Sequence, residues 1–370
     1  MPEPSEPILV NGRFLAQRPT GVQRAAAELV RALDRLDGAA RFTILAPPDA
    51  DLDRLPLATI GIRRIGRRTG YLWEQWELPC AARGRILLNL GNVAPLLHRR
   101  NAILIHDASV LDRPAGYGWR FRAAMRWMLP VLARRAEALF TVSQFSADRL
   151  GHHGVGDRSR YTVLPSGAEH ATRAPADSTA PARLGLPDGR YALFVGSPHP
   201  NKNLAGAIAA IERVSDPGIR LAVVGAADPR VFAGDAAPAG AASGRVVYLG
   251  AVDDAALAGL YGGALALLFP SYYEGSGLPP LEAMALGCPV IASTRASVPE
   301  VCGDAAWLVD PDDTAGMAAA IDRLAADPGR REELIARGRA RAAGFTWAAS
   351  ARLLAATLDR AVRPASRSSG

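Results

Sequence analysis

The sequence predicts an α/β protein made of two domains, each with a parallel sheet. Three observations lead to this expectation. The chain has 370 residues, of which 49% are hydrophobic, enough for two complete cores. Short apolar runs alternate with segments whose apolar residues recur at helical spacing, as in strand–helix–strand units. A stretch without periodicity, residues 171–190, separates two such series and is expected to be a linker.

The first series, in residues 1–170, is expected to form the N-terminal domain. Strands are expected at residues 8–10, 41–46, 85–88, 102–105, 138–142 and 161–164. The helix after the first strand places Val22, Leu29 and Leu33 on one face. Strands that alternate with helices run parallel, so their carboxyl ends should meet at one edge of the sheet, where ligands bind.

The second series, in residues 191–349, is expected to form the C-terminal domain. Its strands are expected at residues 191–195, 221–224, 245–249, 264–269, 290–292 and 307–309. Helices are expected to begin at Leu204, Thr314 and Arg330.

The net charge of +7 comes from the first part of the chain. Residues 1–170 hold 24 Arg against 16 acidic residues, whereas the remainder is almost neutral. Segment 119–135 (WRFRAAMRWMLPVLARR) interleaves aromatic residues and Met with Arg, and Pro130 should break or kink a helix there. It suits either the surface of an anionic membrane or a core-facing helix with a solvated arginine face. No nucleic-acid-binding motif accompanies the charge, so a nucleic-acid partner is not expected.

The composition favours a cytoplasmic protein, peripheral at the inner face of the membrane if segment 119–135 binds lipid. No apolar run approaches the length of a membrane span, and the opening MPEPSEP is unlike a secretory signal. Cys80, Cys288 and Cys302 lack metal-ligand spacing, fit a reducing compartment, and are each expected in or near a core.

Residues 269–300, FPSYYEGSGLPPLEAMALGCPVIASTRASVPE, carry the strongest functional signal. An apolar run ends at Pro270, a glycine-rich turn follows, and Pro279 and Pro280 should open a helix at Leu281. The backbone N–H groups of 275–278 (Gly275, Ser276, Gly277 and Leu278) and of the first helical turn then form an anion site.

Two carboxylates, Glu274 and Glu282, flank this turn. A carboxylate beside a phosphate would repel it, so both are expected to hold neutral hydroxyls on either side of the phosphate. Phosphate between two polyols describes a nucleotide sugar. The alternative is an ordinary strand–turn–helix whose acids are favoured by the helix dipole.

Lys202 is the one lysine of the chain and lies in GSPHPNKN (196–203), between an expected strand and helix. A chain that otherwise uses arginine is expected to need a compact ammonium there, within reach of a diphosphate. The alternative is a solvated lysine at a helix start.

Segment 274–293, EGSGLPPLEAMALGCPVIAS, resembles the donor-binding segment of retaining family-4 glycosyltransferases of GT-B fold, with their E-x7-E signature. The resemblance implies two Rossmann-like domains facing across a deep cleft, and a C-terminal helix, at about 350–370, that crosses back to the N-terminal domain. It also implies that Glu274 contacts the transferred sugar, that Glu282 holds the ribose, and that the amides of 275–278 meet the sugar and diphosphate. The family usually has Phe where this chain has Ser276.

Other loops resemble the same family. Gly196–Asn203 is similar to the loop whose lysine neutralises the leaving diphosphate, although Ser197 and Asn201 stand where arginines are frequent. His199 and an N-domain arginine are the candidates to replace that cation. On the acceptor side, TGVQR (Thr20, Gly21 and Arg24 among them) and the pair His106-Asp107 follow expected strands; the family's His faces the reacting carbon of the donor.

The resemblance implies a retaining, metal-independent hexosyltransferase without a cofactor, of the polysaccharide or lipopolysaccharide mannosyltransferase type. Its partners are a nucleotide sugar and a glycan or lipid-linked saccharide acceptor. Asp253 could accept from the paired N–H donors of guanine, unless Asp253 or Asp254 only caps a helix. Together with the frequent use of GDP-mannose in the family that the chain resembles, this favours GDP over UDP. Two rivals are a phosphorylase-like protein with Lys202 bound to pyridoxal phosphate, and a non-catalytic paralogue that binds glycan or membrane.

Overall fold

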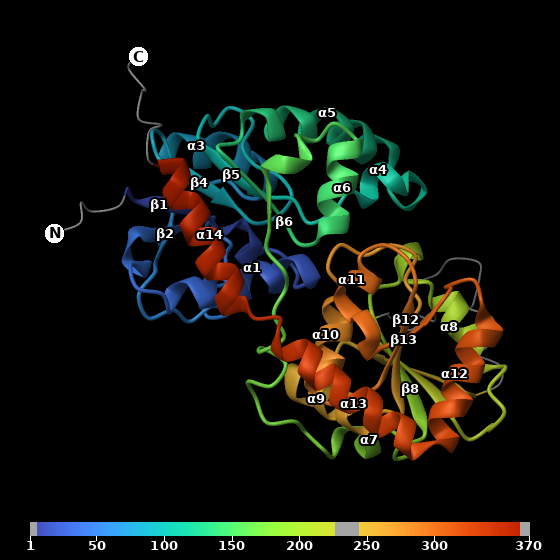
Figure 1. Cartoon of the computed structure of the whole chain (residues 1–370). Helices are drawn as coiled ribbons and strands as arrows, with labels where there is room; N and C mark the ends of the chain where they lie inside the picture. The colour runs from blue at the N-terminus through green and yellow to red at the C-terminus, as the bar shows by residue number, and fades with distance from the viewer. Residues whose placement is uncertain (1–5, 226–243, 363–370) are drawn as a thin grey trace. The chain divides into compact units, whose positions relative to one another are not determined.

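The computed structural model describes residues 6–225 and 244–362, which divide into two compact units. Unit 1 comprises residues 1–166 and 347–370, and unit 2 comprises residues 167–346 (Figure 1). Residues 171–190, expected as a linker, belong to unit 2 and include the short helix α7 (Ala180–Arg183). They are anchored there because the Asp177 N–H donates to the Ala255 carbonyl at 2.9 Å.

Unit 1 contains a seven-stranded parallel sheet in the order β3-β2-β1-β4-β5-β6-β7. Its strands are β1 (Ile8–Asn11), β2 (Phe42–Ala46), β3 (Gly61–Arg64), β4 (Ile86–Asn89), β5 (Asn101–Leu104), β6 (Ala138–Thr141) and β7 (Tyr161–Val163). The sequence did not predict β3, because Arg63 and Arg64 lie on this edge strand and interrupt the apolar pattern. The strand order changes direction between β1 and β4, the position at which such sheets bind ligands.

The helices of unit 1 include α1 (Gly21–Asp34), which packs against the C-terminal helix α14 (Trp347–Val362) (Figure 1). The Ser350 hydroxyl also donates to the Pro165 carbonyl at 2.6 Å. Shorter segments are the 3-10 turn η1 (Gly12–Ala16), α2 (Gly70–Leu72), the π-helical turn η3 (Trp73–Glu77), α3 (Leu78–Ala81), α4 (Ser109–Asp112) and α6 (Gln144–His152).

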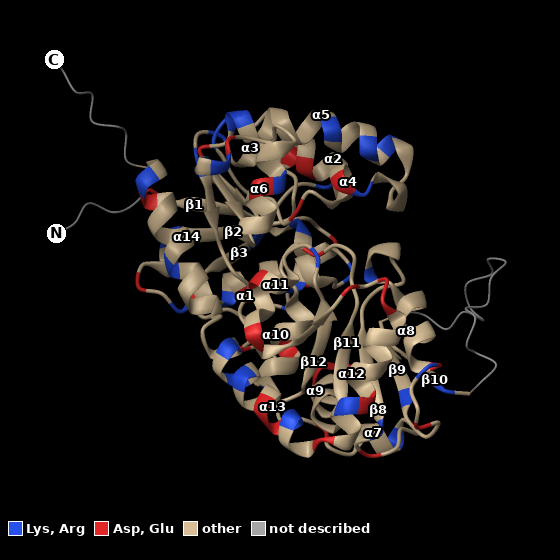
Figure 2. Ribbon diagram, turned by 45° about the vertical axis from the view of Figure 1, so that its right-hand side comes forward, with Lys and Arg blue, Asp and Glu red and all other residues tan. Residues whose placement is uncertain are grey.

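Helix α5 (Trp119–Arg135) continues through Pro130, so of the two expected effects the break does not occur, and the kink stays a prediction. Met125 and Leu129 before the proline, and Leu132 and Ala133 after it, are buried in one core cluster with β5 and β6, which holds both halves of the helix in place. The opposite side exposes Trp119 and Trp127, at 67% and 63%, and arginines recur along the helix (Figure 2). Among the described helices, none combines the length and apolar character that a membrane span needs.

Unit 2 contains a six-stranded parallel sheet in the order β10-β9-β8-β11-β12-β13. Its strands are β8 (Tyr191–Val195), β9 (Arg220–Val224), β10 (Val246–Gly250), β11 (Ala266–Phe269), β12 (Val290–Ser293) and β13 (Trp307–Val309). Helices α8 (Leu204–Ile211) and α12 (Thr314–Ala326) share one core cluster with the sheet, whereas α9 (Asp254–Gly263), α10 (Leu278–Ala285) and α11 (Val298–Cys302) share the other (Figure 1). Helix α13 (Pro328–Ala343) packs on α10.

Two further expectations need correction. Helix α10 begins at Leu278 rather than at Leu281, so both prolines lie inside its first turn, where a missing N–H leaves no helical bond unmade. Cys288 and Cys302 are buried as expected, but Cys80 is exposed at the end of the short helix α3.

Candidate active site

The loops that follow β8 and β11 lie side by side because these two strands are paired. This adjacency brings together two residues that are 72 positions apart in the sequence. The Lys202 Nζ donates to both oxygens of Glu274, at 2.8 and 2.9 Å. The lysine side chain is 23% exposed and the glutamate side chain 11%. Both side chains are therefore largely sheltered from water but keep some exposed surface.

The backbone around Lys202 fixes the position of its side chain. Lys202 ends the 3-10 turn η6 (Pro200–Lys202), and Asn203, at φ 56°, caps α8 by accepting from the Gly206 N–H. A Cβ on Gly196 would lie 3.4 Å from the lysine stem, so the stem runs in van der Waals contact along this glycine. The Tyr272 N–H donates to the Asn201 carbonyl at 2.7 Å, which ties the lysine loop to the glutamate loop.

The glycine-rich turn leads from Glu274 into α10. Gly277 caps the helix at φ 61°, a conformation that favours glycine. Pro279 and Pro280 have no N–H, so the backbone N–H groups left at the start of α10 are those of Leu278 and of the turn before it. That these groups bind an anion stays a prediction. The Ser297 hydroxyl donates to the Glu274 carbonyl at 2.9 Å and holds the turn against the segment before α11.

Glu282 lies in the second turn of α10 and is buried. Its Oε1 contacts His170 Nε2 at 2.8 Å, and its Oε2 accepts from the Tyr261 hydroxyl at 3.1 Å. Both partners are buried as well, with the His170 side chain 2% exposed. Sequence analysis missed both. The available signal was that His170 is one of only six histidines and directly follows an expected strand and turn.

Asp253 is the N-cap of α9 and accepts from the Ala256 N–H at 2.8 Å. Asp253 therefore does cap the helix, and the cap uses one of its two carboxylate oxygens. A contact of the second oxygen with guanine stays a prediction.

In unit 1, His106 follows β5 and is buried. Its backbone N–H donates to the Asn92 side chain at 2.7 Å, and its Nε2 lies 3.0 Å from the Leu90 carbonyl. Burial lowers the pKa of His106, so the neutral ring is the form present near neutral pH. With a carbonyl as its partner, Nε2 carries the proton.

A cavity of about 200 Å³ lies at the carboxyl ends of β1, β4 and β5. It brings together Thr20 and Asp107, two of the residues expected on the acceptor side, while Gly21, Arg24 and His106 do not line it. Thr20 caps α1 in a box with Gln23, and Asp107 accepts from the Ser109 N–H at 2.7 Å.

A buried polar network that sequence analysis also missed adjoins this cavity. Arg13 donates to Glu74 at 2.7 Å, and the Asn11 amide donates to Glu74 at 2.9 Å and to Asn89 at 3.0 Å. Burial raises the pKa of Glu74, although Arg13 and Asn11 oppose the shift. The signal available in the sequence was two asparagines and an arginine at the ends of apolar strands.

Asp310 and Asp312 both pair with Arg295, at 3.1 and 2.7 Å. Within residues 6–225 and 244–362, no three His, Cys, Asp or Glu side chains are grouped so that they could hold a metal ion.

Solved structures identify the fold. Sucrose-phosphate synthase from Thermosynechococcus elongatus superposes with a TM-score of 0.73 at 21% identity, over 96% of this chain and 98% of its own. Alr3699/HepE of Anabaena, solved with UDP and glucose, has a TM-score of 0.75 at 17% identity, over 96% of this chain and all of its own. The two Rossmann-like units therefore form a GT-B fold, as predicted, which is the fold of one class of glycosyltransferases.

Sequence relatives identify the family. Residues 178–341 match the family described as Glycosyl transferases group 1. O-antigen chain mannosyltransferase B of Escherichia coli is 34% identical over 264 residues, 68% of this chain and 68% of its own. D-inositol 3-phosphate glycosyltransferase of Acidothermus cellulolyticus is 36% identical over 228 residues, 57% of this chain, which spans 50% of that relative. The chain belongs to the group 1 glycosyltransferases, as the E-x7-E segment predicted.

Proposed function

We propose that this glycosyltransferase transfers a hexose, with mannose favoured, from a nucleotide diphosphate sugar, with GDP favoured, to a glycan or lipid-linked saccharide. The anomeric configuration is retained, and neither a metal ion nor a cofactor takes part. The observation that carries the proposal is the Lys202–Glu274 pair beside the start of α10, because it sets a cation and a carboxylate next to the turn whose amides are expected to bind an anion. The family supports the reaction class.

Lys202 and the amides of α10 would stabilise the negative charge that grows on the leaving diphosphate. A diphosphate would draw the ammonium from Glu274, and Glu274 would then be free to accept hydroxyls of the transferred sugar. In the ligand-free chain the two charges neutralise each other, so neither is left unpaired in a partly buried site. Gly196, Ser197 and the turn 275–278 would complete the donor contacts, and the role of His106 at the reacting carbon stays a prediction.

Glu274 and Glu282 are expected to hold hydroxyls of the transferred sugar and of the ribose, so neither is assigned the role of a covalent nucleophile. This favours front-face attack assisted by the leaving phosphate. If the reaction is metal-independent, turnover should survive EDTA. Loss of turnover that Mg²⁺ or Mn²⁺ restores would contradict this part of the proposal.

The donor base can be tested with a panel of nucleoside diphosphates. Relatives named as mannosyltransferases support mannose as the transferred sugar, and we expect GDP as its carrier. A nucleotide at 100 times its dissociation constant adds about 2.7 kcal/mol of stability, which a thermal melt resolves. GDP should raise the melting temperature more than UDP, and Asp253→Ala should reduce the effect of GDP selectively. Stabilisation by UDP alone would reject the guanine assignment and the mannose preference together.

A membrane contact through α5 is also proposed, at the cytoplasmic face of an anionic bilayer. The exposed Trp119 and Trp127 next to arginines have the chemistry of an interfacial helix. The protein should sediment with phosphatidylglycerol vesicles and not with phosphatidylcholine vesicles, and Trp119→Ser with Trp127→Ser should abolish this. Equal recovery with both lipids would contradict the contact.

Two alternative functions have direct tests. A phosphorylase-like protein with pyridoxal phosphate on Lys202 would show the cofactor's absorbance after purification. A non-catalytic paralogue would bind nucleotide but would neither hydrolyse nor transfer from the donor sugar. Donor hydrolysis by the protein alone, abolished in Lys202→Ala, is the result expected for the enzyme.

A further inference from the structure

The cavity in unit 1 lies where a ligand-binding site is expected from topology. Its walls come from the segment after β1, the start of α1, Tyr71 of α2, the segments after β4 and β5, and one side of α5. These strands are neighbours, and the order reverses between β1 and β4, so a crevice opens at their carboxyl ends. The π-helical turn Trp73–Glu77 adjoins it, and such turns are frequent at functional sites. The cavity volume of about 200 Å³ suits a single sugar ring.

Aromatic rings form part of the cavity wall. Tyr71 is 54% exposed, and the Arg13 guanidinium lies 3.8 Å from its ring centroid. On another side, Tyr117 and Phe121 stack with their centroids 5.8 Å apart, and Phe121 is 42% exposed. Flat apolar rings that stay accessible in a polar cavity offer faces against which the C–H groups of a sugar can pack.

Amides and hydroxyls supply the hydrogen bonds. Thr20, Gln17 and Gln23 form one chain of contacts, in which Gln23 donates to Gln17 at 3.0 Å. The Asn92 oxygen is engaged by the His106 N–H, which leaves its NH₂ group to donate. Ser109 shares a hydrogen bond of 2.7 Å with the Tyr117 hydroxyl. Groups that both donate and accept match the hydroxyls of a sugar.

The charges of the cavity wall do not suit a phosphate. Among the described residues that line it, Arg13 and Asp107 are the charged ones. Arg13 is already paired at 2.7 Å with Glu74, whose side chain is only 2% exposed. A phosphoryl group carries about −1.5 to −2 charge, and it would meet the Asp107 carboxylate without gaining an unpaired cation.

We propose that this cavity binds the accepting sugar of the acceptor and selects an uncharged, unphosphorylated unit, with the Arg13–Glu74 pair as the selectivity element. The inference rests on the proposed transferase function and names its acceptor class. Tyr71 supplies a stacking face, Asp107 and the amides contact hydroxyls, and Glu74 cancels the charge of Arg13. Glu74 acts through Arg13 and is a positioning residue, not a catalytic one.

The experiment compares two probes on the full-length protein: methyl α-mannoside and mannose 6-phosphate, by saturation-transfer NMR and titration up to about 50 mM, a range that reveals millimolar affinity. The wild type should bind the mannoside and bind the phosphate at least about tenfold more weakly. Glu74→Gln keeps the shape of the side chain and unpairs Arg13. This variant should raise the affinity for mannose 6-phosphate by about tenfold or more. Its affinity for the mannoside should stay within about twofold of the wild-type value.

Two controls keep a negative result informative. Tyr71→Ala changes an exposed position, so it should weaken binding of the mannoside without lowering the melting temperature of the protein. Stabilisation by the nucleoside diphosphate, which tests unit 2, should remain in every variant. Binding of mannose 6-phosphate as tight as that of the mannoside, no binding of either probe, or an unchanged ratio in Glu74→Gln would overturn the inference. If nucleotide binding persists in that case, the transferase function stands; if no nucleotide binds the wild type, the function itself fails.

Discussion

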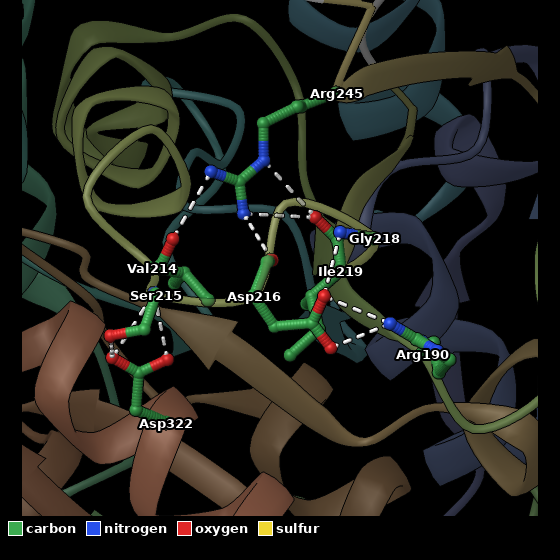
Figure 3. Close-up of polar contacts among 8 residues, drawn as sticks. All are labelled: Arg190, Val214, Ser215, Asp216, Gly218, Ile219, Arg245 and Asp322. Carbon is green, nitrogen blue, oxygen red and sulfur yellow. Dashed lines mark hydrogen bonds and ion pairs between the residues drawn. The ribbon is translucent and has the colours of Figure 1, made fainter.

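The two ends of the sheet in unit 2 both carry charged side chains, and they use them differently. At the amino ends of β8, β9 and β10, the Arg245 guanidinium donates to the carbonyls of Val214, Asp216 and Ile219 at 2.9 to 3.3 Å (Figure 3). Ser215 in the same segment donates its N–H and hydroxyl to Asp322 of α12. At the carboxyl ends, Lys202 pairs with Glu274, and Glu282 with His170 and Tyr261.

The difference lies in the partner. A charge that binds backbone carbonyls can change its partner only if the chain moves, so its contribution is to stability. A charge that binds a side chain on a neighbouring loop can exchange that partner for a ligand while the backbone stays in place. Substitution of charged residues at the amino ends should therefore lower the melting temperature. Substitution of charged residues at the carboxyl ends should leave the protein folded but lower its turnover or its ligand affinity.

The largest effect is expected for Lys202→Ala. Removal of one group that stabilises developing negative charge typically lowers turnover by about 10²–10³. The site keeps some exposed surface, so the loss of folding stability should be small by comparison. Steady-state transfer kinetics and a thermal melt measure the two effects separately.

Lys202→Arg is the matched control for this position. A planar guanidinium replaces a point charge and cannot take the same place between Glu274 and a diphosphate, so the rescue should be incomplete. A wild-type turnover rate in Lys202→Ala would show that Lys202 does not stabilise the leaving diphosphate. The proposed difference between the two ends of the unit 2 sheet would then be wrong.

Glu282→Ala tests the second carboxylate at the same end. If Glu282 holds ribose hydroxyls, its removal leaves them unpaired and weakens nucleoside diphosphate binding by about 1–3 kcal/mol. Isothermal calorimetry gives the affinity directly. Unchanged affinity in a folded variant would mean that Glu282 is a structural acid, like those at the amino ends.

At the amino ends, Arg245→Ala should lower the free energy of unfolding by about 1–3 kcal/mol, because three backbone carbonyls lose their donor. Turnover per folded molecule should not change. Arg190→Ala is the control, since this 55% exposed arginine pairs with the half-exposed Asp216 and should contribute only about 0–1 kcal/mol. A drop in turnover for Arg245→Ala at a temperature where it is folded would contradict the division of roles.

The sequence could predict much of the fold because the central strands are buried on both faces and appear as apolar runs. Strand β3 was not predicted, because an edge strand tolerates the charged Arg63 and Arg64, which interrupt the apolar pattern. For the site, the sequence could predict that Lys202 and Glu274 lie at the same edge of the sheet, because both follow strands. It could not predict that they pair in the absence of ligand, which depends on β8 lying next to β11.

The contact of His170 with Glu282 is a second contact that the sequence could not predict. Its partner lies 112 positions away, and nothing local distinguishes it from a histidine in a loop. The Arg13–Glu74 pair depends in the same way on a π-helical turn reaching the end of β1, and no apolar period encodes that contact. Local periodicity defines elements, whereas partners of buried charges are set by tertiary packing.

The smallest effect is expected for His170, which acts on a ligand only through Glu282. Loss of the 2.8 Å contact in His170→Ala should weaken nucleoside diphosphate binding by about 0.5–1.5 kcal/mol, or about two- to twelvefold. Tyr261→Phe is the matched variant on the other carboxylate oxygen and should have an effect of similar size. Both residues are buried, so a melting curve has to show that each variant is folded under the conditions of the titration.

The decisive comparison uses the 2′,3′-dideoxy form of the same nucleotide. If His170 orients Glu282 toward ribose hydroxyls, the loss of affinity in His170→Ala should disappear with the dideoxy nucleotide, because there is no hydroxyl left to hold. His170→Gln, which can still donate to Glu282, should recover part of the difference. An equal loss with both nucleotides would show that His170 only packs the start of unit 2. A difference seen in Glu282→Ala but absent in His170→Ala would keep the ribose role of Glu282 and reject the coupling.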